Sequence, residues 1–187
     1  VFGTDFYPEL KNSNVQIYND LNYRHWDTWE DGAFSHVFIE NLETKERIDI
    51  MPNEPFDCPQ KPFGGGEDFI WSPDGKQVLY VTKKLSGAAY AISTNTDIYV
   101  YNIETKSTSN LTEDNKGYDT QPAFSANGTL GYLQMKRDGY ESDKNDIIAL
   151  IDGQKINLTE NWDGTVNSFR WSNDGTKVYF HAAIGGT

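Results

Sequence analysis

The chain has 187 residues, which is enough for one sizeable hydrophobic core, and its aromatic content of 14% favours β-structure. The formal net charge of −12 repels a phosphate backbone, and no stretch is long and apolar enough to span a bilayer, so we expect neither a nucleic-acid nor a membrane partner. The single cysteine, Cys58, excludes an internal disulfide and a thiolate metal site.

The first fifty residues hold a pair of predicted strands behind a long irregular segment. Residues 1–4 resemble the second strand of a hairpin, and residues 36–50 read as two further strands. Between them, residues 5–35 contain an aromatic stretch for which we predict a short helix or an ordered loop. The linker over 51–67 is rich in proline and glycine and is predicted to be a loop. No Lys-Ser or Lys-Thr follows its glycines, which argues against a phosphate-binding loop.

The segment after this linker is the clearest structural signal in the chain. An apolar run ending in Trp71 leads into Pro-Asp-Gly at 73–75 and then into the apolar residues 78–81. Proline presets φ, aspartate can bond its own backbone, and glycine accepts a positive φ, so we predict a tight β-hairpin. A second pair of strands follows over residues 97–112.

Both halves of this unit recur along the chain. The hairpin pattern returns at 124–133 and 171–180, and the second strand pair returns at 146–159. Four strands in a repeat of about 40–50 residues are the signature of a β-propeller blade. We therefore predict an all-β fold, a partial β-propeller built from four-stranded antiparallel blades.

The repeats predict how the chain is divided. Within one incomplete propeller domain over 1–187, we predict a partial blade at 1–50, blades at 68–112 and 119–159, and a partial blade at 168–187. Rings of fewer than about four blades do not close around an axis. We therefore expect the chain to be an excised part of a larger propeller.

The connections within the blades differ in length. The turns inside each strand pair are short, whereas the connections at 5–35, 83–96 and 135–145 are long. In an up-and-down blade the long connections all leave on one face, and loops held by a rigid scaffold often carry function. Their charged and aromatic residues include Arg24, His25, Trp26, Asp27, Trp29, Glu30, Lys83, Lys84, Arg137, Tyr140, Glu141 and Asp143.

No catalytic or metal-binding motif is visible. Gly-x-Ser-x-Gly occurs nowhere, so we predict no catalytic residue. His25, His36 and His181 show no metal-ligand spacing, so we predict no metal and no cofactor. His36 and His181 fall on predicted strands as structural histidines, whereas His25 belongs to an aromatic loop that either packs over the propeller edge or forms part of a site. The acidic stretch 141–143 is either a cation or amine site or a solvated loop.

Three Asn-x-Thr triplets match the glycosylation sequon, at 110–112, 127–129 and 157–159. They occupy equivalent turn or strand-end positions of the repeats. A structural role therefore suffices to explain them.

Several of these motifs resemble a known enzyme family. Residues 71–76 resemble the repeat of TolB-like and WD40-like propellers and of prolyl oligopeptidase-family (S9) serine peptidases. Residues 23–29, 93–99 and 135–144 together, and in this order, resemble bacterial dipeptidyl and acylaminoacyl peptidases of that family. The resemblance extends across nearly the whole chain.

The resemblance implies a role in a larger enzyme. In this family an N-terminal propeller caps an α/β-hydrolase domain with a Ser-Asp-His triad, and that domain is absent from this sequence. The implied role is a substrate gate and specificity lid, with peptide substrates and the hydrolase domain as partners and a periplasmic or secreted location. Acidic propeller residues of related dipeptidyl peptidases hold the free amino terminus of the substrate. This role carries over to Glu141 and Glu30, with Arg137 and His25 as further substrate-binding candidates.

Two other functions remain open on the sequence alone. The first is a non-enzymatic TolB-type propeller whose loop face docks a protein partner. The second is a propeller lyase with a histidine-bound metal, against which the sparse histidines argue. We also expect self-association, because the apolar faces of the first and last blades would be exposed.

Overall fold

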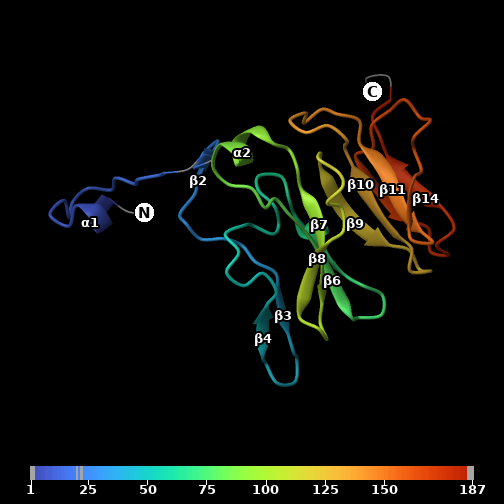
Figure 1. The fold of residues 1–187 in the computed structure, drawn as a ribbon, viewed down its shortest axis with the longest axis horizontal. Coiled ribbons are helices and arrows are strands. Elements are labelled where there is room, and N and C mark those ends of the chain that lie inside the picture. The colour runs from blue at the N-terminus through green and yellow to red at the C-terminus, as the bar shows by residue number, and fades with distance from the viewer. Residues whose placement is uncertain (1–2, 20, 22, 185–187) are drawn as a thin grey trace.

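The structure, a computed structural model, describes residues 3–19, 21 and 23–184, and its ribbon is shown in Figure 1. Two four-stranded antiparallel sheets stand side by side, in the orders β5-β6-β7-β8 and β12-β11-β10-β9. The first sheet comprises β5 (Phe69–Trp71), β6 (Gln77–Thr82), β7 (Asp97–Asn102) and β8 (Ser107–Asn110). The second comprises β9 (Asp119–Phe124), β10 (Leu130–Gln134), β11 (Asp146–Ile151) and β12 (Gln154–Asn157). The nearly all-β, four-stranded antiparallel architecture confirms the predicted fold class.

Smaller elements flank the two sheets. Two-stranded pairs are formed by β1 (Arg24–His25) with β2 (Thr28–Trp29), β3 (Phe38–Glu40) with β4 (Arg47–Asp49), and β13 (Ser168–Trp171) with β14 (Val178–His181). The helices are α1 (Gly3–Phe6), α2 (Gly87–Ile92) and the 3₁₀ turn η1 (Gly66–Asp68). Within the part of the chain that is described, no helix has the length and apolar character needed to cross a membrane.

The core lies between neighbouring sheets, and strand β6 shows how it is built. Alternate side chains of a strand point to opposite faces. Val78 and Tyr80 join a buried cluster with the β3–β4 pair on one face, and Leu79 and Val81 join a second cluster with the next sheet on the other. A third cluster joins that sheet to the residues around β13–β14. Each sheet is therefore packed face to face against its neighbour, as in propeller blades.

Local hydrogen bonds fix the hairpin turns. Ser72 Oγ donates to Asp74 Oδ1 at 2.6 Å, Gln77 N donates to Ser72 Oγ at 2.9 Å, and Gly75 has φ +69°. The turn between β13 and β14 repeats this arrangement with Ser172 and Asp174, where the Oγ to Oδ1 distance is 2.5 Å. The same residues therefore form the same turn in two blades, as their sequence pattern predicts.

The Asn-x-Thr triplets at the ends of β8 and β12 are structural. Thr112 Oγ1 accepts from Ile98 N at 3.0 Å, and Thr159 Oγ1 accepts from Ile147 N at 3.0 Å. In each triplet the asparagine carbonyl accepts from the threonine N–H, at 3.0 and 2.9 Å. Both threonine side chains are buried, so the triplets close the last strand of each sheet.

The N-terminal part differs from the expectation. Gly3 and Thr4 begin helix α1 instead of a strand, because the Gly3 N–H donates to Val15 O at 2.7 Å and the Tyr7 N–H donates to Gly3 O at 2.8 Å. Val1 and Phe2, the other half of that expected strand, lie outside the described residues. Where we predict a short helix or an ordered loop, residues 23–30 form the β1–β2 ribbon, an ordered turn between two short paired strands. His36 lies just before β3 and not on a strand.

Candidate functional site

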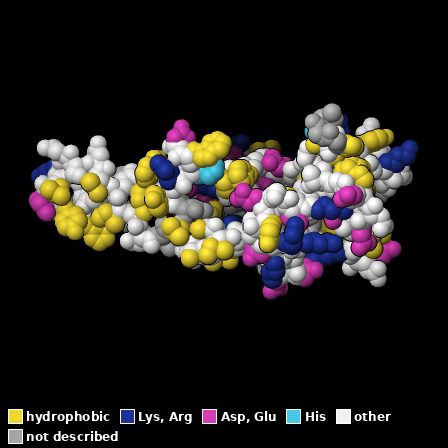
Figure 2. All heavy atoms as spheres, turned by 90° about the horizontal axis from the view of Figure 1, so that it is seen from above, with side chains coloured by type: hydrophobic (Ala, Val, Ile, Leu, Met, Phe, Trp, Pro, Cys, Tyr) yellow, Lys and Arg dark blue, Asp and Glu magenta, His cyan; other side chains and the backbone are white. Residues whose placement is uncertain are grey.

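The long connections meet at one end of the blades. In Figure 1 the β1–β2 ribbon, helix α2 and the β10–β11 connection lie at the upper end, whereas the β3–β4 and β7–β8 turns point down. We call these the loop end and the turn end. Figure 2 looks onto the loop end and shows hydrophobic side chains there beside basic and acidic ones. The arrangement agrees with the prediction that the long connections share one face.

A cavity of about 820 Å³ opens at the loop end. Its walls come from the β1–β2 ribbon, the 60–63 loop, the α2 segment, Tyr118 and the β10–β11 connection. The ribbon contributes His25, the β10–β11 connection contributes Glu141, and Lys83 and Tyr90 come from the α2 segment. We call this the polar cavity. Two of the four predicted substrate-binding residues, His25 and Glu141, therefore line the same cavity.

Hydrogen bonds between distant loops hold this cavity open. Asp138 Oδ1 accepts from Ser93 Oγ at 2.6 Å and from Thr94 N at 2.9 Å, and the Gly139 N–H donates to Thr94 Oγ1 at 3.0 Å. The bond from Ser93 holds the pKa of Asp138 below its usual range. Asp138 therefore acts as an ionised clamp between the α2 segment and the β10–β11 connection.

Arg137 supports Asp143 and not Glu141. Its Nε and one terminal nitrogen donate to Asp143 Oδ1 at 2.9 and 2.7 Å, and its backbone N–H donates to Asp143 Oδ2 at 2.9 Å. These bonds lower the pKa of Asp143 to about 2. The guanidinium also lies 4.5 Å from the ring centroid of Tyr140. Arg137, a predicted substrate-binding candidate, is therefore committed to Asp143 and Tyr140 and is not among the residues that line the polar cavity.

Glu141 is the acidic residue in the lining of the polar cavity. Among the described residues, no hydrogen bond or ion pair occupies its carboxylate. Lys144, which could have paired with it, lies 2.8 Å from Asp146 Oδ1. Burial and the negative charge of Glu141 both raise the pKa of Tyr118, which also lines the cavity. Burial lowers the pKa of Lys83, and the charge of Glu141 opposes that shift. Glu141 is therefore an exposed carboxylate with spare acceptor capacity.

Lys83 is the competing cation in this wall. Its Nζ donates to the Ser93 carbonyl and lies 4.6 Å from the centroid of the Tyr90 ring. Burial lowers the pKa of this ammonium, despite the nearby charges of Asp138 and Glu141. The partners of Lys83 are a backbone carbonyl and an aromatic ring, so Lys83 forms no ion pair with the Glu141 carboxylate among the described residues.

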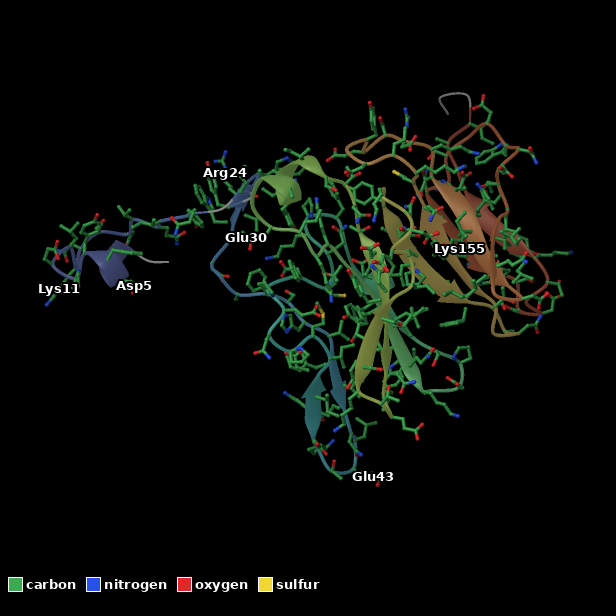
Figure 3. All side chains as sticks on the ribbon, viewed as in Figure 1. Asp5, Lys11, Arg24, Glu30, Glu43 and Lys155 are labelled. Atoms are coloured by element: carbon green, nitrogen blue, oxygen red, sulfur yellow. The ribbon has the colours of Figure 1, made fainter. Side chains whose placement is uncertain are left out.

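Glu30 is already paired with an internal lysine. Lys61 Nζ lies 3.0 Å from Glu30 Oε2 and 3.5 Å from Asp57 Oδ2. Burial lowers the pKa of Lys61, but the bonds and charges of Glu30 and Asp57 outweigh it, so the net pKa is raised. Figure 3 shows Glu30 below the ribbon on the side of the blades, with Arg24 on the opposite side. Glu30 therefore fastens the ribbon to the 57–62 loop.

A second cavity of about 580 Å³ lies beside the first. The two share the wall residues His25, Lys61, Pro62 and Tyr90. The rest of its lining is mainly apolar or aromatic and includes Ile17, Leu21, Tyr23, Phe34, Phe56 and Leu85. We call this the apolar cavity.

The histidines take different roles. His25 stacks on Trp26 with ring centroids 5.3 Å apart and meets Phe63 edge-on at 5.8 Å, so it is a packing residue at the rim of both cavities. His36 bonds Asp49 Oδ2 and the Glu54 carbonyl, each at 2.9 Å, which confirms a satisfied structural histidine. Over residues 3–19, 21 and 23–184, no cluster of three or more His, Cys, Asp or Glu side chains is placed to hold a metal ion.

Sequence reasoning missed part of the cavity wall. Lys61 and Pro62 come from the segment that reads as a plain connector, and Tyr90 and Tyr118 carry no motif. A usable signal is the charge pattern, because Lys61 stands four residues after Asp57.

We compared the sequence with known protein families and with curated proteins. No protein-family profile matches the chain. It is 41% identical over 185 residues to dipeptidyl-peptidase 5 of Porphyromonas gingivalis, covering 95% of this chain and 27% of that protein. It is 30% identical over 176 residues to dipeptidyl-peptidase 5 of Schizosaccharomyces pombe, covering 85% of this chain and 25% of that protein. The chain thus spans about a quarter of the length of these relatives.

A solved structure supports the fold independently. TolB from Acinetobacter baumannii superposes with a TM-score of 0.53 at 21% identity, covering 81% of this chain and 33% of TolB. At this identity the match speaks for the propeller fold alone. Together the comparisons confirm the predicted resemblance to the propeller portion of a dipeptidyl peptidase, with relatives from bacteria and fungi.

Proposed function

We propose that this chain, which is homologous to a propeller portion of the dipeptidyl-peptidase 5 proteins, is the substrate gate and specificity lid of a longer serine exopeptidase. The chemistry of peptide cleavage belongs to a hydrolase domain outside this sequence, since the chain contains no Gly-x-Ser-x-Gly. The chain's own part is to admit peptides at the loop end and to hold their free amino terminus.

The observation that carries this proposal is the unpaired carboxylate of Glu141 in the polar cavity. The neighbouring carboxylates are committed: Asp138 to Ser93 and Thr94, Asp143 to Arg137, and Glu30 to Lys61. An ammonium group that enters the cavity can therefore bind the Glu141 carboxylate without breaking an existing bond of that carboxylate. A charge-assisted hydrogen bond of this kind is stronger than a neutral one and selects for a positive ligand.

The test compares substrates with and without an amine in the longer protein expressed from its gene. Glu141→Gln keeps the shape of the side chain and removes its charge. We expect kcat/KM for dipeptidyl substrates with a free amino terminus to fall roughly 10–100-fold, corresponding to ~1.5–3 kcal/mol for a charged hydrogen bond. An ester substrate without an amine should be cleaved nearly as before.

The control is Glu43→Gln, because Glu43 lies at the tip of the β3–β4 turn, at the turn end (Figure 3). This substitution should leave both substrates unaffected. Equal losses on the two substrates with Glu141→Gln, accompanied by a lower melting temperature, would show that Glu141 only shapes its loop and would refute the anchor.

The second candidate is a TolB-type propeller that docks a protein partner on the loop end, where the side chains of Trp26 and Tyr140 are exposed. The two candidates differ in what the longer gene product does. A binder would hydrolyse no dipeptidyl substrate and would have no hydrolase region beside the propeller. Hydrolysis that a serine-directed fluorophosphonate blocks would exclude it.

A further inference from the structure

The β10–β11 connection, which carries Glu141, is held at two places. Its base is closed by Arg137, which donates to Asp143 at 2.7–2.9 Å through its side chain and its backbone N–H. Both residues belong to this connection, so their bonds define its shape without fixing its place in the cavity wall. That place depends on a second attachment, to the residues that follow helix α2.

The second attachment is centred on Asp138. Its Oδ1 accepts from Ser93 Oγ at 2.6 Å and from Thr94 N at 2.9 Å. The Gly139 N–H donates to Thr94 Oγ1 at 3.0 Å, and Thr94 is buried, with an exposed fraction of 5%. A Cβ added at Gly139, where φ is +79°, would lie 3.6 Å from Ile92 O, so this turn packs directly on the end of helix α2.

Glu141 lies between these two attachments along the chain. Among the described residues, no hydrogen bond or ion pair holds its carboxylate. Glu141 and Thr94 both line the polar cavity, so the place of the carboxylate relative to Thr94 depends on the backbone that carries it. Without the carboxylate of Asp138, the connection would keep its closed base but lose the 2.6 and 2.9 Å bonds that align it with the rest of the wall.

We propose that Asp138 is a positioning residue for the amine anchor: its bonds to Ser93 and Thr94 hold the Glu141 carboxylate where a substrate ammonium enters the polar cavity. This inference rests on the proposed function and adds a residue that acts through Glu141 without binding the substrate. The bond from Ser93 holds the pKa of Asp138 below its usual range, so both bonds are charge-assisted and stronger than neutral ones.

The experiment uses the longer protein expressed from its gene and the variant Asp138→Ala. The substrates are a dipeptidyl amide with a free amino terminus and an ester without an amine. We expect kcat/KM for the amide to fall about tenfold, mainly through a higher KM, because a displaced carboxylate loses part of its contact with the ammonium. The ester should be cleaved nearly as before.

The matched control is Asp74→Ala at the turn end. Asp74 Oδ1 also accepts from a serine Oγ at 2.6 Å, that of Ser72, so both variants remove a bond of the same kind. Both should lower the melting temperature, but only Asp138→Ala should reduce the preference for the amine-bearing substrate. Equal losses on the two substrates with Asp138→Ala, or no loss on either, would overturn the positioning role.

The variant Asp138→Asn separates positioning from direct attraction of the ammonium. Its amide carbonyl can still accept from Ser93 and Thr94, but the side chain carries no charge. Positioning predicts that Asp138→Asn recovers part of the activity on the amide that Asp138→Ala loses. If the charge of Asp138 itself attracted the substrate, the two variants would be equally impaired, which would refute positioning.

A double variant tests whether Asp138 acts through Glu141. If it does, Asp138→Ala combined with Glu141→Gln should be no slower on the amide than Glu141→Gln alone. If the two losses multiply instead, Asp138 acts independently, and this inference fails while the proposed function stands. If Glu141→Gln alone leaves the amide unaffected, the amine anchor of the proposed function fails, and the positioning role fails with it.

Discussion

The loop end and the turn end of the same blades use aspartate in opposite ways. At the loop end, Asp68 and Asp119 begin or precede the first strand of a blade and are buried, with exposed fractions of 2% and 0%. Burial raises the pKa of each to about 7, against hydrogen bonds that lower it. At the turn end, Asp174 is exposed, and its bond from Ser172 lowers its pKa to about 2.

The two ends therefore differ in whether their carboxylates stay in water or are buried. The turn-end carboxylates fold back on their own backbone within a few residues and remain in water. The loop-end carboxylate of Asp119 instead joins two strands: it accepts from Gln134 on β10 at 2.8 Å, as well as from the nearby Asn115 at 3.0 Å. The loop end, which holds the cavities, therefore combines buried charge with long-range bonds, whereas the turn end needs neither.

The largest expected effect is a loss of stability as the pH rises. Because the folded pKa values of Asp68 and Asp119 lie near 7, above an ordinary value of 3.8, the folded state holds these protons more tightly than the unfolded state. Their contribution is fully present below about pH 4 and is lost as the pH rises through 7, at most about 4 kcal/mol for each group. Urea unfolding at pH 5 and pH 8 measures this difference in the free energy of unfolding.

Two variants decide whether the buried aspartates cause it. Asp119→Asn should reduce the pH dependence between 5 and 8, because an amide does not titrate, whereas Asp68 still contributes to it. Asp174→Asn, at the turn end, should leave this window unchanged, since that group titrates near pH 2. A pH dependence that survives Asp119→Asn undiminished would contradict the contrast between the two ends.

The next largest effect concerns the buried threonines at the loop end. Thr159→Val removes the acceptor of the Ile147 N–H and the 2.7 Å bond to Asp146 while preserving the volume. A buried N–H without a partner should lower the free energy of unfolding by about 1–3 kcal/mol. Thr105→Val, in the exposed β7–β8 turn, removes only a bond to Ser107 and should be nearly neutral. Thermal unfolding of the two variants measures this difference. Equal melting temperatures for Thr159→Val and Thr105→Val would contradict a stabilising role of the buried Thr159 hydroxyl.

A smaller effect is expected from the backbone of the turn end. Gly75 has φ +69°, and a Cβ added there would meet no heavy atom within 4 Å, so Gly75→Ala strains the backbone without a clash. We expect a loss of about 1 kcal/mol in the free energy of unfolding. Gly66→Ala is the matched control, since that glycine is equally open and its φ is not positive. Equal urea midpoints for the two variants would show that the turn carries no conformational demand.

The same contrast explains what could be predicted from the sequence. The hairpin around Gly75 follows from residues within a few positions of each other. The bond of Thr112 to Ile98 at the end of the same blade follows from a sequence that recurs in the next blade. The sequence pattern is sufficient to predict both. The β1–β2 ribbon, helix α2 and the wall containing Lys61 depend on contacts between distant segments, such as the bond of Ser93 to Asp138 and that of Lys61 to Glu30. Apart from the spacing of Asp57 and Lys61, no local pattern in the sequence indicates these contacts. The sequence identifies Glu141 as a loop carboxylate, but its unpaired state depends on where Arg137 and Lys144 point.

The smallest effect on stability is expected from a substitution of Arg137. Its effect on the neighbouring carboxylates shows whether Arg137 acts on Asp143 or on Glu141. Its side chain is 61% exposed, and its partner is Asp143, so Arg137→Gln should change the melting temperature little. The pKa of Asp143 should rise from about 2 toward its ordinary value, because the bonds from Arg137 come first among the causes that lower it. Carboxyl chemical shifts measured by NMR across an acid titration report this change. If Arg137 instead kept Glu141 ionised, the Glu141 resonance would shift and the Asp143 resonance would stay in place. Arg47→Gln, which breaks an exposed pair with Glu40 at the turn end, is the matched control and should move neither resonance.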